Sequence, residues 1–93
     1  MPHYDIHATF VNSVGQELFT TTVLIQREIL IGKPAWHGDC DLEPWMRLHP
    51  SLYRLDLHDE LEGQSLNVYV SNIGDDGAAL FGNGDSYPTP KHP

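Results

Sequence analysis

The chain has 93 residues, enough for one domain with a limited core, and its 13 acidic against 5 basic residues give a net charge of −8. Nucleic-acid binding by phosphate neutralisation requires a basic face, so this charge excludes that class of function. The single cysteine excludes an intrachain disulfide and is typical of a reducing compartment. With no apolar run long enough to span a bilayer and no basic-then-apolar signal region, the sequence predicts a cytoplasmic protein without membrane contact.

The N-terminal third has the pattern of β-strands. Residues 4–10 alternate between apolar and polar with a period of two, and a Gly- and Asn-containing turn follows at 12–16. The next run, 18–31, is rich in β-branched residues and is divided by polar residues at 26–28. It fits two strands with a tight turn or one long strand with a bulge, and the shared phase of its apolar residues favours the long strand.

The segment from Lys33 to Pro50 interrupts the strand patterns and holds both tryptophans, the cysteine and several carboxylates. Long connections in compact domains are more often functional than structural. We therefore predict that this segment is an irregular loop that carries the site. Within it, Pro44 is placed to open a short helical turn at 43–49, and Pro50 to end it.

The C-terminal half begins with the strongest hairpin signal in the chain. Two alternating runs, 53–57 and 66–70, surround a polar turn at 59–64. A Gly-Asp-Asp-Gly turn at 74–77 precedes a short strand at 78–81. We predict one β-rich domain over 1–86 and a Pro-rich flexible tail over 87–93.

The predicted fold is all-β, or β-rich α+β. It is a small antiparallel sandwich or open barrel of about six strands, with at most one short helical turn near 43–49. The residues in the apolar phase of each strand should form the core: Tyr4, Ile6, Ala8, Phe10, Phe19, Val23, Ile25, Ile29, Ile31, Tyr53, Leu55, Leu57, Leu66, Val68 and Val70.

The sequence contains no motif that specifies a reaction, since a nucleophile elbow, a phosphate-binding loop and a dinucleotide fingerprint are all missing. His37, Asp39, Cys40 and Asp41 are potential metal ligands, but no second Cys/His pair has the spacing of a zinc site. The two aspartates also disfavour a thiolate at Cys40. We therefore expect no enzymatic activity, no cofactor and no metal.

Aromatic and acidic residues mark the predicted binding surface. Trp36 and Trp45 bracket the acidic stretch, and each can either plug an open end of the domain or act as an exposed anchor for a protein or a carbohydrate. Asp39, Asp41 and Glu43 would share one face of an extended segment, and the hairpin turn supplies a second acidic tip. The predicted partner-binding residues are Trp36, Asp39, Asp41, Glu43, Trp45, Arg47, Asp59, Glu60 and Glu62.

These features predict a small, acidic, non-enzymatic binding protein or inhibitor. Immunity proteins and phage anti-defence proteins are built in this way, and such a protein would occupy a basic surface of a larger protein, for example a nucleic-acid-binding groove. Two alternatives remain open. One is a ligand- or metal-binding module that uses the 33–50 segment, and the other is a structural subunit that assembles through exposed strand edges and the tail.

Overall fold

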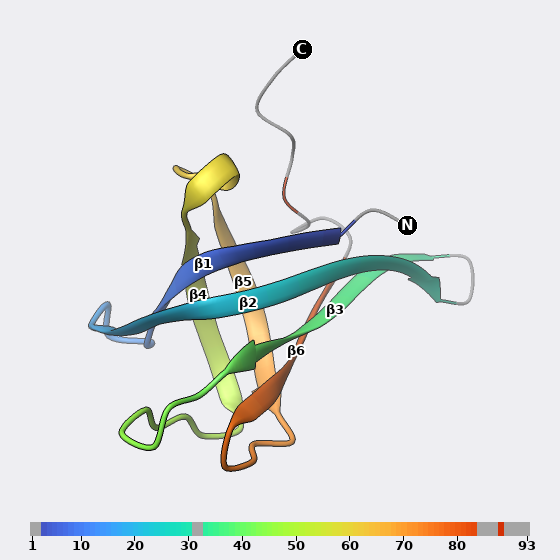
Figure 1. Cartoon of the computed structure of the whole chain (residues 1–93). Helices are drawn as coiled ribbons and strands as arrows, with labels where there is room; N and C mark the ends of the chain where they lie inside the picture. Colours follow the sequence, from blue (N-terminus) through green and yellow to red (C-terminus); the bar gives the residue numbers. More distant parts are fainter. Residues whose placement is uncertain (1–2, 31–32, 84–87, 89–93) are drawn as a thin grey trace.

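The computed structural model describes residues 3–30, 33–83 and 88, and within them six antiparallel strands form a closed barrel with one lone 3-10 turn (Figure 1). The all-β antiparallel prediction is confirmed, with the barrel closed rather than open. Apart from the buried Pro88, the predicted tail over 87–93 lies outside the described residues, as do the side chains of Ile29 and Ile31. The elements are β1 (His3–Val11), β2 (Glu17–Leu30), β3 (Lys33–Asp41), β4 (Ser51–Leu57), η1 (Asp59–Leu61), β5 (Ser65–Ser71) and β6 (Gly77–Asn83).

The barrel consists of two three-stranded meanders joined at their edges. The strand order is β1-β2-β3-β6-β5-β4, and β4 pairs with β1 to close the ring. Since β3 and β4 are not neighbours, the connection between them, residues 42–50, crosses an end of the barrel. We call residues 42–50 the crossover.

Strand β2 is one long strand, as its apolar phase predicted. It pairs with β3 in continuous register from Val23 to Leu30, so the pairing shows no bulge at 26–28. The register shift lies instead near the start of β2, where Phe10 of β1 pairs with Phe19 but the next residue, Val11, pairs with Glu17. The prediction of a bulge in this strand was right in kind and wrong in position.

The first half of the predicted loop is in fact strand β3. Trp36, Gly38 and Cys40 are buried in the barrel, while Asp39 and Asp41 are exposed. The sequence concealed this alternation because the inward positions lack β-branched residues and aspartate is depleted in strands. The irregular connection is therefore only the crossover, which contains a hydrogen-bonded turn and no helix; the helical turn that the structure describes is η1.

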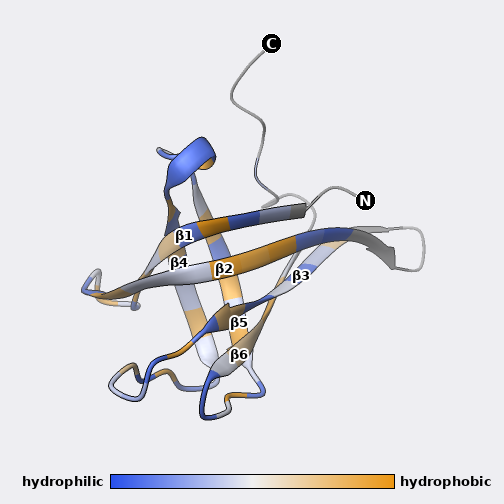
Figure 2. Ribbon diagram, viewed as in Figure 1, coloured by the Kyte–Doolittle hydropathy of each residue, from blue (hydrophilic) through white to orange (hydrophobic). Residues whose placement is uncertain are grey.

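The predicted core is confirmed over most of its length. Ile6, Ala8, Phe10, Phe19, Val23, Ile25, Tyr53, Leu55, Leu57, Leu66, Val68 and Val70 are all buried in one cluster, and Tyr4 packs against it while partly exposed. Hydrophobic residues accordingly recur along the strands, and η1 is hydrophilic (Figure 2). The core also includes residues that the sequence did not predict, such as Leu61 and Leu80.

Two glycines make room inside the barrel. Trp36 is paired with Gly82 across β3 and β6, and a Cβ added to Gly82 would lie 2.1 Å from the Trp36 indole. A Cβ added to Gly38 would lie 1.8 Å from the Leu24 carbonyl oxygen of β2. Neither position has space for a side chain, so glycine is required at 82 by the approach of the Trp36 indole and at 38 by the approach of the β2 backbone.

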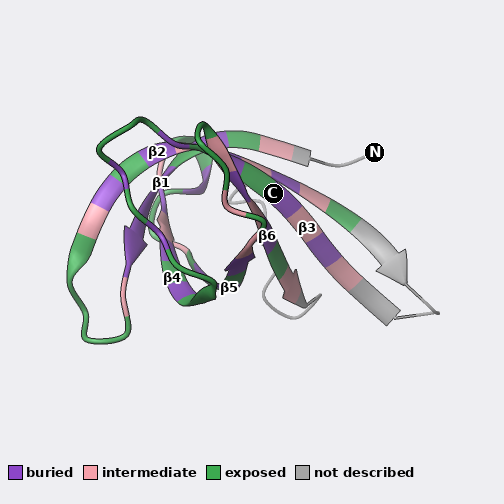
Figure 3. Ribbon diagram, turned by 90° about the horizontal axis from the view of Figure 1, so that it is seen from below, coloured by how far each residue is buried: buried purple, intermediate pink, exposed green. Residues whose placement is uncertain are grey.

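Apolar residues close both ends of the barrel. At one end the crossover buries Leu42, Met46 and Leu48 and alternates them with exposed residues (Figure 3). At the other end η1 contributes Leu61, which is fully buried. Among the described residues, no helix combines the length and the apolar character that a membrane span requires.

Candidate functional site

The crossover is held firmly against its end of the barrel. The Thr21 hydroxyl donates to the Asp41 carbonyl (2.7 Å), and the His49 N–H donates to the Tyr53 hydroxyl (3.1 Å). The Leu42 N–H donates to the Asp76 carbonyl (2.9 Å), which brings the β5–β6 loop, residues 72–76, beside the crossover. We call Asp41, the crossover and this loop together the crossover end.

Trp45 stands out from the crossover end with 62% of its surface exposed. Its ring packs edge-on against Phe19, with ring centroids 6.0 Å apart, and Phe19 in turn contacts Phe10 in the core. Its Nε1–H donates to the Glu43 carboxylate (3.3 Å). The tryptophan is therefore exposed and oriented at the same time, a combination that lowers the entropy cost of binding.

A hollow of ≈ 400 Å³ lies in the crossover end. Its buried lining residues, Leu42, Met46 and Leu48, are apolar, and its exposed ones include the carboxylates of Glu43 and Asp75. Arg47 also lines it, and its guanidinium donates to the carbonyls of Pro44 and Met46. An apolar base with two carboxylates suits a long basic side chain, whose stem is apolar and whose head is cationic.

The structure separates the predicted partner-binding residues into three groups. Asp41, Glu43, Trp45 and Arg47 are exposed at the crossover end, and Asp39 is exposed on β3 two residues before Asp41. Trp36 is only 1% exposed, so its assignment to the binding surface was wrong. It faces inward because its strand position shares the phase of Gly38 and Cys40.

The acidic tip formed by Asp59, Glu60 and Glu62 lies at the opposite end of the barrel, on and beside η1 (Figure 1). Asp59 has a structural role there, since its carboxylate accepts the backbone N–H of His7 (2.9 Å) and contacts the His7 Nδ1 (3.0 Å). These hydrogen bonds, the backbone one first, lower the pKa of Asp59. Because the two acidic groups lie at opposite ends, they cannot act on one flat partner surface.

Asp75 and Asp76 were not among the predicted partner-binding residues, yet both are exposed at the crossover end. A topological signal was available for them. Because the strands of a hairpin run in opposite directions, the loop after β5 must lie at the end where β4 begins, and the crossover leads into β4. The predicted turn at 74–77 thus belongs beside the residues just before Ser51.

The histidine and cysteine of the predicted ligand cluster lie on opposite faces of β3. Cys40 is buried inside the barrel, whereas His37 occupies the outward phase and is partly exposed. Within residues 3–30, 33–83 and 88, no three His, Cys, Asp or Glu side chains are grouped so as to hold a metal ion. His37 and Cys40 therefore do not face a common site on β3.

Cys40 should be unreactive in the native protein. Burial, with a smaller contribution from the Asp39 and Asp41 charges, raises the pKa of its thiol to about 11. We expect iodoacetamide at about pH 8 to alkylate native Cys40 roughly a hundredfold more slowly than urea-unfolded Cys40. Because burial penalises the thiolate, this group leaves folding stability unchanged below about pH 9 and lowers it as the pH rises toward 11. Equal alkylation rates would contradict this assignment.

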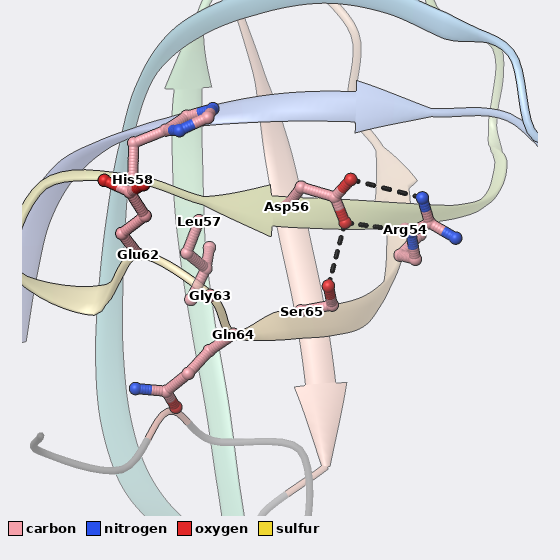
Figure 4. A pocket seen from close by; sticks show the side chains of 8 residues that line it. All are labelled: Arg54, Asp56, Leu57, His58, Glu62, Gly63, Gln64 and Ser65. Atoms are coloured by element: carbon pink, nitrogen blue, oxygen red, sulfur yellow. Dashed lines mark hydrogen bonds and ion pairs between the residues drawn. The ribbon is translucent and has the colours of Figure 1, made fainter.

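A second hollow, of ≈ 430 Å³, lies beside η1 and is lined in part by Arg54, Asp56, His58 and Ser65 (Figure 4). Its polar groups bind one another. Arg54 donates twice to the Asp56 carboxylate (2.9 and 3.2 Å), and the Ser65 hydroxyl donates to it as well (2.8 Å). The hydrogen bond from Arg54 lowers the pKa of Asp56. In this hollow Arg54, Asp56 and Ser65 bind one another and are not directed at a ligand. We therefore assign the site to the crossover end.

The comparisons with known proteins do not bear on this assignment. No protein-family model, curated protein or solved structure matches the chain. Its function is therefore inferred from the chemistry of the crossover end.

Proposed function

We propose that this protein is a non-enzymatic binding protein that occupies a basic surface of a larger protein through the crossover end. Trp45 serves as the anchor, and a Lys or Arg side chain of the partner enters the adjoining hollow. The observation that carries the proposal is an exposed tryptophan, oriented by Phe19 and Glu43. It belongs to the same crossover as a hollow with buried apolar residues at its base and the side chains of Glu43, Asp75 and Arg47 at its edge.

The charge of this end supports a basic partner. Asp41, Glu43, Asp75 and Asp76 are exposed there, and the guanidinium of Arg47 is turned to two carbonyls of the crossover. Carboxylates at the edge of an interface mainly raise the association rate, and this effect weakens with salt. A buried aromatic anchor instead slows dissociation. By covering a basic groove, the protein would prevent the partner from binding its own acidic ligand there.

A defined basic probe tests the proposal. We expect a nona-arginine peptide to bind, to shift the NMR signals of the crossover end, and to bind more weakly at about 500 mM than at about 50 mM NaCl. The double variant Glu43→Gln/Asp75→Asn should lower the association rate roughly fivefold. The matched control Glu60→Gln/Glu62→Gln removes the same charge at the opposite end and should have less than about a twofold effect. Equal losses in both variants would show attraction to net charge alone.

Trp45→Ala tests the anchor separately. We expect it to raise the dissociation rate so that affinity falls by about 2 kcal/mol, or roughly thirtyfold, while the domain stays folded. Val14→Ala is the control, because Val14 is 83% exposed in the turn between β1 and β2 and should leave affinity unchanged. If Trp45→Ala melts the domain, or leaves binding intact, the anchor assignment is wrong.

A further inference from the structure

A row of exposed apolar side chains runs across the outer face of β4, β5 and β6. Leu52 lies directly opposite Tyr69, and Tyr69 lies directly opposite Phe81. These side chains are 66%, 45% and 45% exposed. Side chains of directly paired residues lie side by side on the same face of a sheet, so the three form one row. We call Leu52, Tyr69 and Phe81 the outer row.

The outer row is not needed by the barrel. The interior behind it is filled by Val68, Val70 and Leu80, which are fully or almost fully buried. The neighbouring outward positions on β5 and β6 hold only small or polar residues, which cannot cover it: Asn67, Ser71 and Ala79. A contiguous exposed apolar patch that contains Tyr and Phe is typical of a protein–protein interface.

We infer that the outer row joins two copies of this chain in a two-fold dimer. The row is self-complementary: its middle residue, Tyr69, has one apolar neighbour on each side. With a two-fold axis passing by Tyr69 along the strands, each Tyr69 meets its counterpart. Each Leu52 then meets the other copy's Phe81, so that all three residues are covered in both copies.

The distribution of charge favours a second copy at this face. Each copy carries a net charge of −8, so two copies repel one another over most of their surface. The outer row and its outward neighbours on β5 and β6, Asn67, Ser71 and Ala79, carry no charge. Arg54 on β4 and Asp39 on β3 flank this area with one charge of each sign, and the acidic crossover end and η1 tip lie beyond it at the two ends of the barrel. Two acidic copies can therefore approach at this face with the least repulsion.

Closure of the barrel sets the mode of association. Every described strand has two hydrogen-bonded neighbours over at least part of its length, and at Tyr69 strand β5 is paired on both sides, so the outer row offers a face and not an edge at that point. Two copies that meet at the outer row therefore pair face to face.

Sedimentation velocity over a range of concentrations tests the dimer. We expect a reversible monomer–dimer equilibrium whose dimer fraction rises between about 50 and about 500 mM NaCl, because salt screens the repulsion between copies. Binding at the crossover end responds to salt in the opposite direction, so the two proposals fail independently. Tyr69→Glu should raise the dimer Kd by more than roughly tenfold. Val14→Glu adds the same charge at a more exposed apolar residue on the other side of the barrel and should leave the Kd unchanged.

A cross-linking variant keeps the test valid if Tyr69→Glu unfolds. Since Tyr69 lies at the two-fold axis, Tyr69→Cys should form an intermolecular disulfide in oxidised glutathione, whereas Val14→Cys should not; the native Cys40 is buried. A protein that stays monomeric at all concentrations and salts, a dimer indifferent to Tyr69→Glu, or equal cross-linking of both cysteine variants would overturn the inference.

Discussion

Replacing Gly38 by alanine is expected to lower the free energy of unfolding by at least about 3 kcal/mol, a large share of the stability of a domain of this size. The added Cβ would lie 1.8 Å from the Leu24 carbonyl oxygen and 2.9 Å from its carbonyl carbon. Both atoms belong to the backbone of β2, which cannot rotate away as a side chain can. The strands must separate locally, and hydrogen bonds of the β2–β3 ladder are then lost.

Gly74→Ala is the matched control for this substitution. A Cβ at Gly74 would meet only the Gly77 carbonyl oxygen, at an ordinary contact distance of 3.7 Å. We expect its effect to stay below about 1 kcal/mol. Equilibrium urea unfolding followed by tryptophan fluorescence measures both variants. A Gly38→Ala variant as stable as Gly74→Ala would show that β2 and β3 are less closely paired at this point.

The second large effect concerns the contact between Trp36 and Gly82. Gly82→Ala should cost about 2 kcal/mol, because the new methyl group would overlap the Cε2, Cζ2 and Nε1 atoms of the fully buried indole. Trp36→Phe should cost about 1–3 kcal/mol through the cavity it leaves. Phenylalanine lacks the outer fused ring with Cζ2, so it should relieve part of the overlap with alanine at position 82.

A double-mutant cycle therefore gives the sharpest readout of this contact. We expect the double variant to be more stable than the sum of the two single losses predicts, by about 1 kcal/mol or more. Unfolding free energies of the four proteins, measured under one set of conditions, provide the coupling energy. Strict additivity would mean that the indole and Gly82 do not constrain one another.

Sequence reasoning succeeded where the inward positions of a strand hold large aliphatic residues. Leu55, Leu66 and Val68 alternate with polar neighbours, so their strands and their buried face followed directly from the pattern. It failed at β3, whose inward residues are Trp36, Gly38 and Cys40. Only the position of Gly82, 46 residues away from Trp36, explains why an indole is accommodated there, and no local pattern contains that information.

In the candidate site, too, some features follow from the local sequence and others depend on tertiary structure. The exposure of Trp45 and the acidic character of the crossover were accessible from composition, whereas the approach of Asp75 depends on how the barrel closes. Trp36 and Trp45 both lie in the 33–50 segment beside polar residues, but Trp36 is buried inside the barrel and Trp45 is exposed. Their difference arises from tertiary register, which periodicity does not specify. Tyr69, by contrast, stood in the polar phase of its strand, and that irregularity was a visible signal of the outer row.

The division of the barrel into two meanders has a consequence for how the chain folds. The turns within 3–41 and within 51–83 join neighbouring strands, so each half can form its hairpins locally and early. The ring closes only when β1 meets β4 and β3 meets β6, contacts that link the two halves. Until then each half presents two unpaired edges and an unsealed interior, which makes it prone to aggregation. The crossover therefore links the two halves covalently and sets the effective concentration at which they meet. If the chain were cleaved within the crossover, closing the barrel would become a bimolecular association of two fragments.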